Sequence, residues 1–187
     1  MSRFVAWMPD EAAQAGLMAL RQKLGVTLPN AGNYQWRAAP QLHMTLRFLG
    51  YFSEDIEPEL EESLAVLAAD ASRIVLQFDR VEYWPGSNVL VARPAESAQL
   101  NLLLHQIDSA ASAAGYTEYA GPQTPHVTLA YADKRHPPSG ATTCPSASCL
   151  EATRGHISIV TTATGGYTHD AWWPLQDPPL ENPGYLR

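Results

Sequence analysis

The sequence predicts an α+β fold: a bilobal, pseudo-two-fold arrangement of two antiparallel sheets that face a central cleft, with helices on the outside. Two observations predict it. The expected elements run strand, helix, strand, helix, hairpin, helix, strand, strand, and one tetrapeptide pattern occurs once in each half of the chain. The 187 residues are enough to bury a core and hold no interior linker long enough to divide them. We therefore expect residues 1–187 to form a single two-lobed domain.

The N-terminal half is expected to hold three strands and two helices. Leu17, Leu20 and Leu24 recur at helical spacing after Asp10, and Ser53 precedes a second helical stretch as an N-cap residue does. The expected strands cover residues 4–8, 34–37 and 42–50, and the expected helices cover residues 9–24 and 53–69.

The C-terminal half is expected to begin with a hairpin, because an alternating apolar run ends at the turn sequence Trp84-Pro85-Gly86-Ser87. An Ala/Leu-rich helix follows and ends at Gly115. The expected strands cover residues 74–83, 89–92, 126–131 and 155–162, the helix covers residues 95–114, a Pro-, Ser- and Thr-rich loop covers residues 134–148, and a last apolar segment covers residues 172–175.

Composition narrows the class of partner. The chain has a net charge of −7 and no basic stripe, so an RNA ligand is expected to be held at its end, or to be a nucleotide or a short oligomer. No apolar stretch approaches the about eighteen residues that a membrane helix needs, and the N-terminus lacks the pattern of a signal peptide. We expect a cytoplasmic monomer that does not contact a membrane.

The two cysteines, Cys144 and Cys149, lie in the predicted loop. The expected compartment favours free thiols, with a small disulfide loop as the alternative. Two cysteines do not make a zinc site, and no pair of histidines has zinc-finger spacing. We expect no metal and no cofactor.

The repeated pattern is His43-Met44-Thr45-Leu46 and His126-Val127-Thr128-Leu129, each in a predicted strand that begins close after a proline. A strand sends residues i and i+2 to the same face, so each copy presents an imidazole and a hydroxyl side by side. Histidine titrates near neutrality, with an ordinary pKa of about 6.5, and can act as an acid or as a base. Two such units facing each other supply both functions, together with two hydroxyls for phosphoryl oxygens.

At these residues the chain resembles the two-histidine phosphoesterases, and within them the RNA 2′,3′-cyclic phosphodiesterases once called 2′-5′ RNA ligases. The segments that carry the resemblance are Pro40 to Gly50 and Thr124 to Leu129. The resemblance implies metal-independent hydrolysis of RNA or nucleotide 2′,3′-cyclic phosphates to 2′-phosphates. It implies His43 as the proton donor, His126 as the proton acceptor, and Thr45 and Thr128 as residues that bind the phosphate.

The chain departs from this family at Tyr131, where the second signature usually has arginine, five residues after the histidine. Tyrosine cannot supply the positive charge that an arginine brings to a phosphate. We expect Arg47, Lys134 or Arg135 to compensate. Candidate substrate contacts are Phe48, Tyr131 and Arg47, although packing in the core is the favoured interpretation of Phe48.

Two alternatives stay open. One is a phosphodiesterase of a small cyclic nucleotide, such as an ADP-ribose cyclic phosphate. The other is a nucleotide-binding module that keeps the fold and has lost useful turnover, which the tyrosine at position 131 favours. Three of the remaining histidines, His105, His136 and His156, are interpreted as surface or packing residues. For His169 the favoured interpretation is the same, and the alternative is that it lines the cleft.

Overall fold

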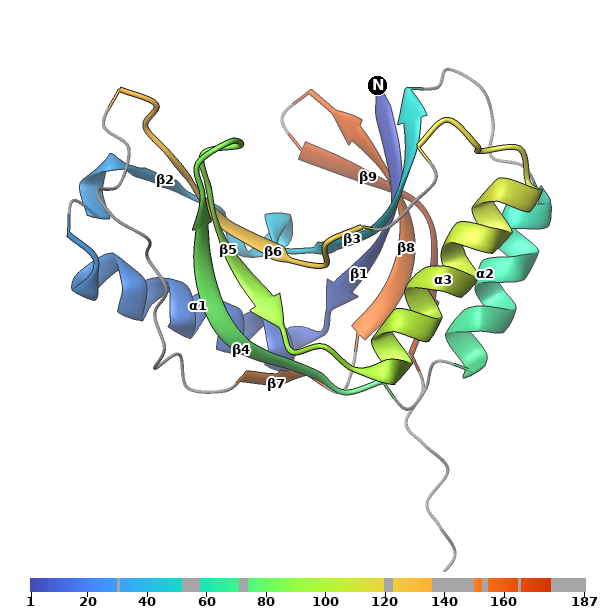
Figure 1. Cartoon of the computed structure of the whole chain (residues 1–187), viewed down its shortest axis with the longest axis horizontal. Helices are drawn as coiled ribbons and strands as arrows, with labels where there is room; N and C mark the ends of the chain where they lie inside the picture. The colour runs from blue at the N-terminus through green and yellow to red at the C-terminus, as the bar shows by residue number, and fades with distance from the viewer. Residues whose placement is uncertain are drawn as a thin grey trace, which may run out of the picture.

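A long antiparallel sheet is bent into an open trough with helices along its outer side (Figure 1). The computed structural model describes residues 1–29, 31–51, 58–70, 74–119, 123–135, 150–152, 155–164 and 166–175. In this part of the chain the strands are β1 Ser2–Pro9, β2 Tyr34–Trp36, β3 Met44–Tyr51, β4 Leu76–Trp84, β5 Val89–Pro94, β6 Val127–Ala132, β7 Leu150–Ala152, β8 Gly155–Ala163 and β9 Gly166–Pro174. The helices are α1 Glu11–Thr27, α2 Pro58–Asp70 and α3 Ala98–Ala113, with 3₁₀ turns η1 Ala31–Asn33 and η2 Ala39–Gln41.

The strands follow the order β7-β4-β5-β6-β3-β1-β8-β9, with β2 paired to β6. Each of these pairings is antiparallel. The path divides into two halves, because its central strands β3 and β6 share a single register pair, Met44 opposite Val127. The halves diverge on either side of this pair, and the trough opens between them (Figure 1).

A strand–helix–strand unit occurs once in each half. In the first, β1 ends at Pro9, Asp10 caps α1 by accepting from the Ala13 amide at 2.8 Å, and β3 pairs with β1. In the second, β5 ends in a proline, Ser97 caps α3 by accepting from the Leu100 amide at 3.1 Å, and β6 pairs with β5. The two units are arranged alike about the Met44–Val127 pair, which accounts for the pseudo-two-fold arrangement.

The helices cover the outer side of the sheet. Helix α1 contacts β7 and η1, while α2 and α3 pack together against strands of the other half, β3, β8 and β9 (Figure 1). Leu17, Leu20 and Leu24 of α1 are buried, as their spacing predicts. The main core lies between these helices and the sheet.

A second, smaller apolar cluster comprises Phe4, Ala6, Met8 and Val160, with Phe48 and Tyr167 packed against it. Its members on β1 alternate with Val5 and Trp7, which belong to the main core. A strand sends alternate residues to opposite faces, so this cluster lies on the trough side of the sheet. It forms an apolar floor beside the first motif.

The α+β class, the antiparallel pairing and the outer helices are confirmed. The two expected sheets are joined through the Met44–Val127 pair into one path. Strand β7 was not predicted, since three residues are too few for a detectable alternation, and β9 is longer than the expected segment 172–175. The predicted helix start at Ser53, most of the loop 134–148, and Cys144 and Cys149 lie outside the described residues.

Two absences hold for the described residues alone. No helix there is both long enough and apolar enough to cross a membrane. No group of three or more histidine, cysteine, aspartate or glutamate side chains there is arranged to hold a metal ion.

Candidate active site

The two tetrapeptides meet at the centre of the sheet. Met44 and Val127 are the second residues of their motifs, and they are the pair that joins β3 to β6. Antiparallel register about this pair sets His43 level with Thr128, and Thr45 level with His126. The second residue of each motif is buried in the core. Alternate residues of a strand point to opposite faces, so the histidine and the threonine of both motifs lie on the other face, which is the trough side. The register of β3 and β6 therefore brings two imidazoles and two hydroxyls together, as the motifs predict.

Both motif strands contain a bulge at the same position of the motif. Between Val5 and Ala6 of β1 the partner strand β3 advances from Arg47 to Thr45, which leaves Leu46 as an extra residue. In the second copy, β6 likewise gains Leu129 against β5. Each extra leucine is buried in the main core. A bulge of one residue reverses the facing of every later side chain, so the alternation of each strand shifts after its threonine.

The bulges decide which later residues line the trough. Phe48 and Tyr131, each five residues after its histidine, return to the face that carries the two histidines. Tyr131 is 41% exposed. In an unbroken strand it would point away from Thr128, so the fold brings it toward the candidate site by the bulge at Leu129.

Arg47 lies on the opposite face, and the prediction of a substrate contact or a compensating charge at this residue is wrong. Its side chain is fully buried. It forms an ion pair of 2.7 Å with Asp108 of α3 and donates to the carbonyl oxygens of Tyr116, at 2.8 Å, and Tyr119. The bulge at Leu46 is the physical reason, because it turns position 47 toward α3 and away from the trough.

The two histidine rings are held in the same way. His43 Nδ1 lies 3.0 Å from the Gln41 carbonyl oxygen, and His126 Nδ1 lies 2.8 Å from the Thr124 carbonyl oxygen. A carbonyl oxygen can only accept, so each Nδ1 carries the proton. Each ring therefore keeps Nε2 for proton exchange, and each is oriented by the backbone two residues before it.

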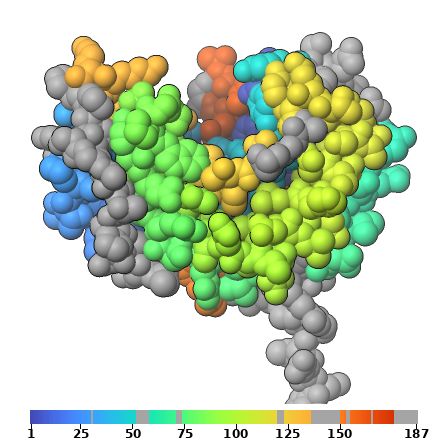
Figure 2. Space-filling model, viewed as in Figure 1, coloured from blue at the N-terminus to red at the C-terminus, as the bar shows by residue number. Residues whose placement is uncertain are grey.

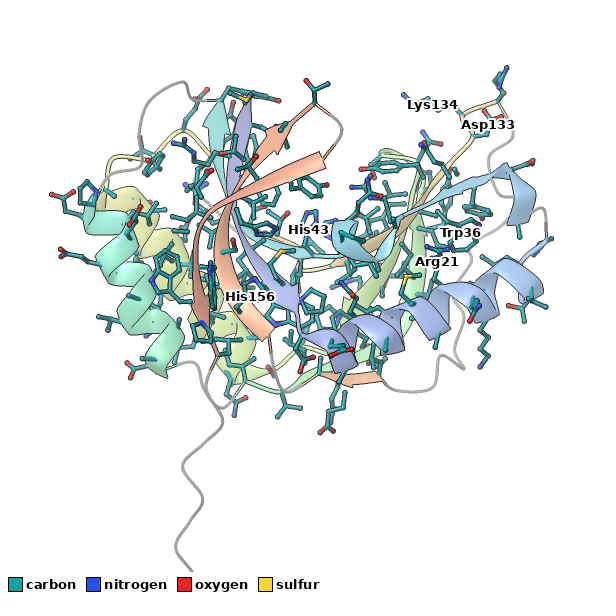
Figure 3. The ribbon with its side chains drawn as sticks, turned by 180° about the vertical axis from the view of Figure 1, so that it is seen from behind. Arg21, Trp36, His43, Asp133, Lys134 and His156 are labelled. Carbon is teal, nitrogen blue, oxygen red and sulfur yellow. The ribbon has the colours of Figure 1, made fainter. Side chains whose placement is uncertain are left out.

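His43 sits in an apolar surround at the middle of the molecule, between the two halves of the sheet (Figure 3). Its ring stacks on Phe4 with 5.1 Å between centroids and meets Tyr167 edge-on at 5.0 Å. The pKa of His43 is lowered from 6.5 to about 4, and burial is the main cause. The hydrogen bond to the Gln41 carbonyl opposes this shift, while the charges of Arg37, His126 and His169 act in the same direction as burial. The unliganded protein therefore keeps this ring neutral near pH 7.

His126 lies against a different set of side chains. Its ring is 4.5 Å from the Trp84 ring, whose indole N–H donates to Glu82 at 2.9 Å. Glu82 also accepts from Arg93 at 3.3 Å. Burial lowers the pKa of His126 below 6.5, and the positive charge of Arg93 adds to this, while the Thr124 carbonyl opposes it.

Arg37 is the site residue that sequence reasoning missed. It follows β2, and its guanidinium carbon lies 5.4 Å from the Tyr131 ring centroid and 5.8 Å from that of Tyr167. Its Nη2 donates to the Tyr167 hydroxyl at 2.6 Å. Its charge is close enough to lower the pKa of His43. The guanidinium thus lies beside Tyr131, the tyrosine that stands where the second signature usually has arginine.

The other two predicted cations lie at the rim. Figure 3 shows Lys134 and Asp133 at the tip of the segment that follows β6, far above the labelled His43. The Arg135 side chain is 85% exposed and pairs with Asp133 at 3.3 Å. The structure therefore brings neither Lys134 nor Arg135 to the histidines.

Two histidines outside the motifs also face the trough, which corrects the interpretation of His156 as an ordinary residue and agrees with the alternative for His169. His156 belongs to β8 and pairs with Met8 of the apolar floor. His169, on β9, is hydrogen-bonded through Nδ1 to Ser158 Oγ at 3.0 Å, and its charge lowers the pKa of His43. The long β9 was not predicted, so the sequence offered no alternation from which to place His169.

The space between the halves is open. Figure 2 shows the molecule hollowed between the β4–β5 hairpin and the segments around β3, with β9 behind. Fold and site together define a class: an α+β protein whose two equivalent strands each present a histidine and a threonine to a shared trough. The chain belongs to the 2′-5′ RNA ligase superfamily, whose family model matches residues 8–166. Membership indicates chemistry of the phosphoesterase or ligase type.

Solved structures agree in fold. The protein TT0787 of Thermus thermophilus matches with a TM-score of 0.70 at 20% identity, covering 95% of this chain and 99% of that one. A crystal structure described as a phosphoesterase matches with a TM-score of 0.66 at 24% identity, covering 94% and 99%. LigT of Escherichia coli, solved in complex with NADP⁺, matches with a TM-score of 0.64 at 24% identity, covering 94% and 98%. At these identities the matches establish the fold alone. No curated protein matches the chain significantly.

Proposed function

We propose that this protein hydrolyses the 2′,3′-cyclic phosphates of RNA ends or nucleotides to 2′-phosphates, with no metal ion, by paired histidine acid–base catalysis. One observation carries the proposal: both imidazoles are fixed through Nδ1 to the carbonyl two residues earlier, and both face the same trough. Two oriented imidazoles on opposite sides of a phosphorus atom supply the acid and the base that opening a cyclic diester needs. The net charge of −7 favours an RNA end or a nucleotide over a long duplex.

The reaction divides between the two motifs. His126 Nε2 takes a proton from water as the water oxygen attacks phosphorus. The bond from phosphorus to the 3′ oxygen breaks, and His43 Nε2 delivers its proton to that oxygen, which leaves a 2′-phosphate. Thr45 and Thr128 donate hydrogen bonds to the non-bridging oxygens, and Arg37 supplies the positive charge that stabilises the phosphorane-like transition state.

The donor role of His43 requires its pKa to rise when substrate binds. In the unliganded protein, burial and nearby positive charge hold that pKa at about 4. A bound phosphodiester carries a negative charge, which favours the protonated ring and offsets the charge of Arg37. Substrate binding is therefore coupled to proton uptake by the pair of histidines.

The test is hydrolysis of 2′,3′-cyclic AMP by the purified protein, with and without chelator, followed by phosphorus NMR of the product. We expect turnover that survives chelation and a predominant 2′-phosphate. A predominant 3′-phosphate would reverse the orientation assigned to the two histidines. Binding of the nucleotide without turnover would favour the binding-module alternative, and turnover confined to an ADP-ribose cyclic phosphate would favour the small-nucleotide one.

A further inference from the structure

A cavity of about 600 Å³ opens next to the first motif, and none of the residues assigned a role in the reaction lines it. It is lined by ends of β1 and α1, by Pro40 of η2, and by three rings of β8 and β9: His156, His169 and Trp172. Pro40 directly precedes Gln41, whose carbonyl orients His43. The cavity therefore adjoins the segment that positions the first catalytic histidine.

The sheet register gives the separation between the cavity and His43. Trp7 of β1 pairs with Met44, so Met8 lies level with His43 on the neighbouring strand, and Met8 pairs in turn with His156. Adjacent strands lie about 4.8 Å apart, which puts the His43 and His156 backbones about 10 Å apart. A ribose ring bridges a gap of this kind between a phosphate held at His43 and a base held at the cavity.

The walls of the cavity suit a flat aromatic group. The Trp172 side chain is 61% exposed although it lies on the face of the trough. The His156 ring braces it edge-on, with 5.6 Å between centroids at 68°, and lies 6.3 Å from the His169 ring. An exposed indole held in place by its neighbours is a stacking surface for a nucleobase, because every base has an aromatic face.

His169 adds an acceptor to this wall. Ser158 Oγ donates its proton to the Ala171 carbonyl oxygen at 2.8 Å, so it accepts from His169 Nδ1 at 3.0 Å. In an uncharged His169 ring, this bond places the one ring proton on Nδ1 and leaves Nε2 without a proton. Such a nitrogen accepts from an exocyclic amino group, which adenine, cytosine and guanine carry and uracil lacks.

The equivalent cavity of the other half differs in its lining. It has about 320 Å³ and lies beside Thr124 and Pro125, just before His126. Its lining includes Arg93 and Glu96 and no aromatic ring. Of these two cavities in the described part of the chain, only the one beside His43 offers a stacking surface.

We propose that the cavity formed by His156, His169 and Trp172 binds the nucleobase of the nucleotide, stacked on Trp172, with a preference for bases that carry an exocyclic amino group. This assignment rests on the proposed function, since it takes the phosphate to lie between His43 and His126. It gives this chain a base-binding subsite on β8 and β9, outside both motifs.

The experiment measures binding of reaction products by calorimetry, so that it does not depend on turnover. The ligands are adenosine 2′-phosphate and methyl riboside 2-phosphate, which lacks a base. Trp172→Ala should weaken binding of the first by about five- to a hundredfold and leave the second unchanged, the usual range for one stacked base. Leu102→Ala, at an exposed position on the outer helix α3, is the matched control and should change neither. His169→Phe, which keeps a ring but no acceptor, should reduce the preference for adenosine over uridine 2′-phosphate.

Loss of affinity for both ligands in Trp172→Ala, or for neither, with an unchanged circular dichroism spectrum, would overturn the base site. The proposed function can fail separately. A protein that binds adenosine 2′-phosphate through Trp172 and hydrolyses no cyclic phosphate retains the base site and loses the reaction. A protein that hydrolyses cyclic phosphates with base-independent affinity retains the reaction and loses the base site.

Discussion

Arg37 and Tyr167, separated by 130 positions in the sequence, are joined by a hydrogen bond of 2.6 Å from the guanidinium to the phenolic oxygen. Arg37 follows β2 in one half of the sheet, and Tyr167 is the second residue of β9 in the other. The Tyr167 ring also meets His43 edge-on at 5.0 Å. The bond therefore holds a cation across the trough and next to the first histidine, at the level where a bound phosphate is expected.

Replacement of this cation is the first prediction. Arg37→Ala should lower kcat/KM for a 2′,3′-cyclic nucleotide by about ten- to a hundredfold, because a hydrogen bond to a charged group contributes about 1.5–3 kcal/mol. Steady-state kinetics at fixed salt give the value. Arg135→Ala removes a cation that is exposed at the rim and should leave kcat/KM unchanged. Equal effects of both variants would mean that Arg37 acts through general electrostatics and does not contact the phosphate.

The sequence predicts those parts of the site that depend on neighbouring residues in the chain, and it does not predict those that depend on partner strands. The two motifs and their strands are local patterns, so both histidines and both threonines could be named from the chain. The bulges at Leu46 and Leu129 are set by the partner strands, and no local pattern shows that positions 48 and 131 turn inward while Arg47 turns out. The role of Arg37 depends on a residue of β9, which lies in another half of the sheet.

The second prediction concerns the paired imidazoles. His43→Ala and His126→Ala should each lower kcat by about a hundredfold or more, the usual scale for loss of a general acid or base. The double variant should lose less than the product of the two single effects, because the two groups act as a unit. Single-turnover kinetics on folded protein measure the chemical step. Near-normal turnover in either single variant would remove that histidine from the mechanism.

The pH dependence of the free protein is the third prediction. The reactive form carries one proton on the pair, and the pKa of each histidine lies below 6.5, that of His43 at about 4. The profile of kcat/KM should therefore be bell-shaped with both limbs below pH 6.5, falling at lower pH as both rings become protonated and at higher pH as both become neutral. The profile of kcat should lie at higher pH, because the bound phosphate raises the pKa of the pair. Identical optima for kcat and kcat/KM would contradict this coupling.

The fourth prediction separates stability from catalysis at Arg47. Arg47→Ala should lower the free energy of unfolding by about 3–5 kcal/mol, since Asp108 and three carbonyl oxygens lose a buried partner. Urea denaturation at neutral pH measures the change. At a temperature where the variant stays folded, its kcat should be close to that of the parent protein. A large loss of kcat without a loss of stability would return Arg47 to the candidate site.

The last prediction asks whether Arg37 and position 131 supply one and the same charge. The bulge at Leu129 turns Tyr131 into the trough, and the Arg37 guanidinium lies over its ring at 5.4 Å. An arginine introduced at position 131 would then reach the same region from the neighbouring strand. In the Arg37→Ala background, Tyr131→Arg should recover about 1–3 kcal/mol of the lost transition-state stabilisation, the range for a charge-assisted hydrogen bond. In the parent protein the same substitution should gain far less, because two guanidinium groups in one place repel each other.

The double-mutant cycle on kcat/KM, run at two salt concentrations, measures this coupling, and Tyr131→Phe serves as the control for loss of the hydroxyl. Additive effects of the two substitutions would mean that the charges act at separate points, and Arg37 would then not be the substitute for the arginine that this chain lacks.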